Sequence, residues 1–153
     1  MSLPRMTFLV NNNHELPEDS VAIRNEENLS ENDFFNRWLS TIFKAGEKLN
    51  PVALISKNTQ INNKHIEKMV VSIFNACPEV GFVYTDALIN LKGYEFIDYF
   101  SGQDLPDESF FVNLTIPIQF DDSPSPRIKV MQNLMVSNRL FVHIPDPLIT
   151  VYH

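Results

Sequence analysis

The sequence predicts an α/β domain with a mainly parallel central sheet and helices on its faces. Short apolar runs alternate with helix-length amphipathic segments, turn residues separate them, and their order is strand, helix, strand, helix, strand. The 153 residues are 44% hydrophobic and 20% charged, which is enough for one buried core. We expect residues 6–153 to form a single domain and residues 1–5 to be a cloning remnant or a disordered start.

The first part of the chain predicts two strands and one helix. Thr7–Val10 is an apolar run that ends at three asparagines, which indicates a buried strand leading into a loop. Residues 21–23 predict a short second strand. Ser30 is the expected N-cap of a helix over residues 31–45. The inward face of this helix repeats every three or four residues, at Phe34, Phe35, Trp38, Leu39, Ile42 and Phe43.

The middle of the chain predicts two further strands around a second helix. Residues 51–55 and 80–84 are the apolar strands, and residues 63–76 form the helix, which Pro78 stops. Lys92 and Gly93 are suited to close a hairpin onto residues 94–99. Beyond it we expect a strand at 116–120, a loop at 121–126, a helix over 128–135 and a last strand at 140–144.

Charge and composition exclude some classes of function. A formal net charge of −7 repels polyphosphate, which argues against a nucleic-acid partner. The chain has one cysteine, Cys77, so no intrachain disulfide can form. No apolar run approaches the ~20 residues that span a bilayer, and no signal peptide is evident. We therefore predict a cytoplasmic protein without a membrane span.

Five short stretches, in this order and spacing, resemble family 2 glycosyltransferases, especially the rhamnosyltransferase-like branch. They are Phe-Leu-Val-Asn-Asn-Asn at residues 8–13, Ile-Arg-Asn-Glu-Glu-Asn-Leu-Ser at 23–30, Leu-Ile-Ser-Lys-Asn-Thr at 54–59, Pro-Glu-Val-Gly-Phe-Val-Tyr at 78–84, and Ile-Pro-Asp-Pro-Leu at 144–148 with Tyr152 and His153 after it. The resemblance implies a truncated GT-A-like domain that binds a nucleotide-sugar.

The resemblance also implies a set of site residues. Asn11, Asn12, Lys57 and Asn58 are the expected nucleotide contacts, although the asparagines equally suit strand-end turns and Lys57 equally suits an exposed surface. Asp86 follows a buried strand, where parallel sheets open their ligand crevice, and either binds a metal or caps a turn. The other candidates are His153 for the metal, and Asp121 or Asp122 for the catalytic base or an ordinary solvated loop.

The chain also departs from the family pattern in three places. No strand precedes Thr7 to hold the nucleotide base, and Lys57 with Asn58 replaces the acidic pair that binds a divalent cation. Residues 125–127 begin the predicted helix where the family has its catalytic carboxylates. A divalent cation, manganese or magnesium, is therefore a cofactor that the family implies but that the altered acidic motif is poorly suited to bind. The chain is either a weakly active or partner-dependent sugar transferase, or a non-catalytic binding or assembly module, and its uncovered sheet edge suits a homo-oligomer.

Overall fold

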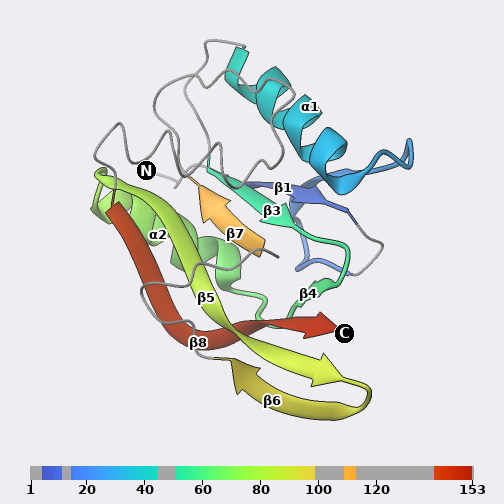
Figure 1. Ribbon diagram of the computed structural model, residues 1–153. Coiled ribbons are helices and arrows are strands. Elements are labelled where there is room, and N and C mark those ends of the chain that lie inside the picture. The colour runs from blue at the N-terminus through green and yellow to red at the C-terminus, as the bar shows by residue number, and fades with distance from the viewer. Residues whose placement is uncertain (1–4, 12–14, 45–50, 99–108, 113–139, 153) are drawn as a thin grey trace.

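The computed structural model describes residues 5–11, 15–44, 51–98, 109–112 and 140–152. Figure 1 shows a strongly curved sheet, with the second helix of the chain packed behind it and the first helix beside its N-terminal strands. The elements follow in the order β1 (Thr7–Val10), β2 (Val21–Arg24), α1 (Glu31–Lys44), β3 (Val52–Ile55), β4 (Thr59–Ile61), α2 (Ile66–Ala76), β5 (Val80–Leu91), β6 (Tyr94–Asp98), β7 (Ser109–Val112) and β8 (Leu140–Tyr152). Neither helix in these ranges has the length and apolarity needed to cross a bilayer.

The strands form one mixed sheet. Seven of them lie in the order β2-β1-β3-β7-β5-β8-β4, and β6 pairs with β5 outside this path. Among the described strands three pairs are parallel: β1 with β2, β1 with β3, and β5 with β8. The pairs β3–β7, β5–β7, β5–β6 and β4–β8 are antiparallel.

The predicted mainly parallel sheet with helices on its faces is therefore wrong. The strands expected at 7–10 and 51–55 are adjacent and parallel, but β7 is inserted antiparallel between β3 and β5. Past Tyr84, β5 continues to Leu91 as one long bent strand, which Figure 1 shows alongside β8. These long-range pairings decide the sheet type, and periodicity within a segment carries no information about them.

The main hydrophobic core lies between α2 and one face of the sheet. Helix α2 buries Ile66, Val70, Val71 and Phe74, because apolar residues recur on one side of it. The strand residues that meet them come from β1, β3, β5, β7 and β8, and include Phe8, Ala53, Val83, Phe111 and Ile149. Residues of the opposite sheet face are also buried, among them Leu9, Leu54 and Phe82.

Two local predictions are confirmed, one at the start of α1 and one at the β5–β6 turn. Ser30 caps α1, because its Oγ accepts a hydrogen bond from the amide of Asp33 at 3.2 Å. Lys92 and Gly93 both have positive φ angles, 51° and 91°, which is the geometry of a two-residue type I′ hairpin between β5 and β6. Within α1, Phe34 is buried, whereas Trp38 is partly exposed.

Other boundaries differ from the predictions. Helix α2 begins at Ile66, three residues later than expected, and β8 runs through Pro145 and Pro147 to Tyr152. Strands β4 and β7 have no counterpart in the prediction. The strand expected at 116–120 and the helix at 128–135 lie outside the described residues.

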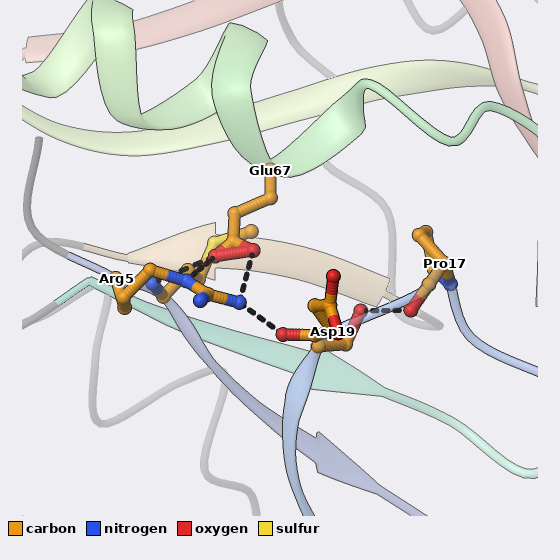
Figure 2. A network of polar contacts seen from close by, with 6 residues as sticks. Arg5, Pro17, Asp19 and Glu67 are labelled. Carbon is orange, nitrogen blue, oxygen red and sulfur yellow. Dashed lines mark hydrogen bonds and ion pairs between the residues drawn. The ribbon is translucent and has the colours of Figure 1, made fainter.

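The first described residue, Arg5, connects three segments of the chain (Figure 2). Its Nε lies 3.1 Å from Glu67 Oε2 on α2, and its Nη2 donates to the carbonyl oxygen of Asp19. The amide of Met6 donates to the same carboxylate oxygen of Glu67 at 3.2 Å. Glu67 therefore holds the start of β1 against the first turn of α2.

Candidate functional site

A polar crevice lies at the carboxyl ends of β1, β2 and β3. It has a volume of about 400 Å³ and is open to solvent. Its lining is mostly amide and charged side chains: Asn11, Arg24, Asn25, Glu26, Asn28, Leu29 and Lys57.

The sheet topology explains why these residues meet. Strands β1, β2 and β3 are parallel, and Val10 pairs with both Arg24 and Ile55. Residues that follow the three strands must therefore lie along one edge, where sheets of parallel strands open their ligand crevices. Asn28 has a φ of 53°, a left-handed conformation that asparagine tolerates, and it turns the chain from β2 toward α1.

A hydrogen-bond network centred on Asn25 holds the floor of the crevice. Asn25 Nδ2 donates to Asn11 Oδ1 at 2.6 Å and to the carbonyl oxygen of Leu29 at 2.7 Å. Asn25 Oδ1 accepts from the amide of Leu29 at 3.0 Å. The network continues to α1 and β3, because Glu31 Oε1 accepts from Asn11 Nδ2 at 3.3 Å and from the amide of Lys57 at 3.0 Å.

The charges around the crevice are mixed. Arg24 and Lys57 bring two cations to its lining and Glu26 brings one anion. Glu31 stands in the first turn of α1, where its carboxylate already matches the positive end of the helix dipole. Amide donors and two cations suit a ligand with phosphate and hydroxyl oxygens.

The structure brings together two of the four residues predicted to contact a nucleotide. Asn11 and Lys57 line the crevice. Asn58 is exposed in a turn, and its carbonyl oxygen accepts from the amide of Tyr152 at 2.9 Å. Asn12 lies outside the described residues, as do Asp121, Asp122 and His153. Their predicted roles stay predictions.

Asp86 lies in a different environment from the crevice. Its side chain is 1% exposed on β5, and its Oδ1 lies 2.5 Å from His143 Nε2 on β8. The imidazole of His143 stacks on the ring of Tyr84 with 4.8 Å between centroids. Burial, and secondarily the charge of Asp86, raises the pKa of the Tyr84 phenol.

No metal centre is visible around Asp86. Among the residues that the structure describes, no three His, Cys, Asp or Glu side chains gather closely enough to hold an ion. The neighbour of Asp86 is an imidazole whose Nε2 bonds to the carboxylate. The described contact of the Asp86 carboxylate is with His143, and its predicted metal role stays a prediction.

Sequence reasoning missed Arg24, Asn25 and Asn28 as site residues, although all three lie in the quoted stretch 23–30. The available signal was that these polar side chains cluster at and just after the end of a predicted strand. His143 carried no such signal, because its partner Asp86 is 57 residues away.

A scan of the sequence against protein-family models gives no match, and no curated protein matches it. The functional assignment therefore depends on the residues and their geometry.

Proposed function

We propose that this chain is a glycosyltransferase-like domain that binds a nucleotide-sugar through its diphosphate. The observation that carries the proposal is the polar crevice where Asn11 and Lys57 meet Arg24 and Asn28. Arg24 comes from the stretch 23–30, which resembles the family in sequence. The same crevice therefore contains residues from three separate stretches that resemble glycosyltransferases.

The charges support phosphate binding of modest strength. A guanidinium bonds two phosphate oxygens at once, and an ammonium acts as a point charge beside it. Glu26 in the lining and Glu31 beside it offset part of this attraction. The described part of the crevice has no cluster of carboxylates for a cation. We therefore expect weak binding that changes little when manganese is added.

A cytoplasmic location is a further part of this proposal. So is the transfer of the sugar to an acceptor. Direct displacement at the anomeric carbon needs a base for the acceptor hydroxyl. Asp121 or Asp122 is the carboxylate that the family resemblance implies for this step.

Calorimetry with uridine and thymidine diphosphates, each with and without manganese, tests the proposal. Lys57→Gln and Arg24→Gln should each weaken binding about 10-fold, which is ~1.4 kcal/mol. The matched control is Lys68→Gln, because Lys68 is an exposed lysine on α2, away from the crevice lining. This variant should bind like the unaltered chain.

Two results would contradict the proposal. Absence of binding for both nucleotides, with or without manganese, removes the nucleotide-sugar assignment. A manganese-driven gain of ~10-fold or more contradicts metal-independent binding and indicates carboxylate ligands that the crevice lining does not contain.

A further inference from the structure

Asp86 and His143 form a pair with the geometry of a carboxylate that orients an imidazole. The carboxylate is buried, the imidazole side chain is 28% exposed, and 2.5 Å separates Oδ1 from Nε2. When the Nε2–H of a neutral histidine donates to a carboxylate, Nδ1 keeps its lone pair. The stacked ring of Tyr84 adds a second constraint on the orientation of the imidazole.

The strand pairing is irregular at this position. Thr85 pairs with Ile144, Asp86 with Pro147 and Ala87 with Ile149, so β8 bulges on both sides of its pairing with Asp86. Bulges concentrate next to active sites, where they redirect a side chain. A buried carboxylate costs stability compared with an apolar residue, and the Asp86 side chain is 1% exposed in the middle of β5, which makes it a candidate functional group.

Asp86 lies in the middle of β5, level with the ends of β1 and β3 where the crevice opens. Val83 and Ala53 both pair with Phe111, and Ala53 pairs with Phe8, so these residues are level across the sheet. Three residues further along their strands come Asp86, Ser56 and Asn11, which share one face because side chains alternate. Two strand spacings separate β5 from β3, roughly 10 Å, and His143 on β8 lies one spacing further, at roughly 14 Å from β3.

We infer that His143, in place of Asp121 or Asp122, is the general base that takes the proton of a hydroxyl-bearing acceptor, and that Asp86 is its positioning residue. This inference rests on the proposed function for the identity of the donor. His143 Nδ1 takes the proton from the acceptor hydroxyl while the hydroxyl oxygen forms its bond to the anomeric carbon. The bond from that carbon to the diphosphate oxygen breaks, its electron pair leaves with the nucleoside diphosphate, and the imidazolium then returns the proton to water.

Chemical modification tests the pair without any donor. Diethyl pyrocarbonate carbethoxylates neutral imidazole nitrogens, and mass spectrometry follows each histidine separately. His65 is an exposed internal reference. At pH 8 His143 should react at least as fast as His65, and in Asp86→Asn it should react more slowly than His65. Asp146→Asn, which removes an exposed carboxylate from the same strand, should leave both rates unchanged. Slower reaction of His143 than of His65 in the unaltered chain overturns the inference.

Turnover tests the chemical role. The probes are uridine diphosphate glucose and thymidine diphosphate rhamnose, with water as acceptor, and the readout is released nucleoside diphosphate. His143→Gln should lower the release rate by ~10²-fold or more while the Kd for the nucleoside diphosphate stays unchanged. Release by His143→Gln at the unaltered rate overturns the base, as does binding without any release by the unaltered chain. Failure to bind either nucleoside diphosphate overturns the proposed function instead. The carbethoxylation rates then decide, without any donor, whether Asp86 makes the His143 imidazole more reactive.

Discussion

Replacing Asn25 with alanine should destabilise the domain more than any other single asparagine change near the crevice. The substitution removes three hydrogen bonds: those to Asn11 Oδ1 and to the carbonyl oxygen of Leu29, and the one from the amide of Leu29. At about 1 kcal/mol each their sum is ~3 kcal/mol. Because the site is only partly buried, water replaces some of these contacts and the expected loss is about 2 kcal/mol. The backbone bond from the Asn25 amide to the carbonyl oxygen of Val10 remains.

Urea unfolding followed by circular dichroism measures this loss. With a slope of about 2 kcal/mol per molar urea, a loss of ~2 kcal/mol lowers the midpoint by ~1 M. An unchanged slope shows that the effect is on the native state and not on the compactness of the unfolded chain.

Asn63→Ala is the matched control, because its side chain accepts a single exposed hydrogen bond, from the amide of His65 at 2.8 Å. We expect it to lose about 0.5–1 kcal/mol. Equal losses for Asn25→Ala and Asn63→Ala would refute the reasoning, since they would mean that the Asn25 network contributes no more than one solvated bond.

Three further predictions concern other parts of the molecule. Phe34→Ala should cost ~3–5 kcal/mol because Phe34 is 1% exposed, and Trp38→Ala should cost less because Trp38 is partly exposed; equal losses in urea melts would contradict this ranking. Arg5→Ala should lower the urea midpoint only slightly, because the Arg5 side chain is 53% exposed and water screens its ion pair with Glu67; a loss as large as that of Phe34→Ala would be inconsistent with that. A hydrogen bond to Glu79, together with burial, raises the pKa of the Cys77 thiol. Glu79→Gln should therefore speed alkylation of Cys77 by iodoacetamide at pH 8. An unchanged rate would show that Glu79 does not control the reactivity of the thiol.

Local chemistry made part of the fold predictable. The N-cap at Ser30 and the turn at Lys92 and Gly93 depend on residues within a few positions of each other, and both are present. The short apolar strand at Thr7–Val10 was predictable for the same reason. Strand β7 was not, because Ser109–Val112 acquires its place only by pairing with β3 and β5. Local periodicity therefore could not predict whether the sheet is parallel or mixed.

The candidate site divides in the same way. Asn11 and Lys57 were predictable because each follows a strand end, and strand ends gather at one edge of parallel strands. Asp86 was identified as a notable carboxylate, but its contact with His143 depends on the register of β5 against β8. No spacing within one segment encodes that register, which is why the pairing of Asp86 with His143 was not predicted.

The position of β8 between β5 and β4 has a consequence for how the chain folds. The side chain of Tyr152 on β8 reaches Gln60 on β4 across a sequence separation of 92 residues, and β4 pairs with no other described strand. Contacts of such high sequence separation carry a loop-closure entropy that must be overcome before any pairing enthalpy is gained, and this slows folding. Until β8 docks, β5 presents an unpaired apolar edge to other chains. We therefore expect refolding yield to fall as protein concentration rises, with the commitment to aggregation made before the β5–β8 ladder closes.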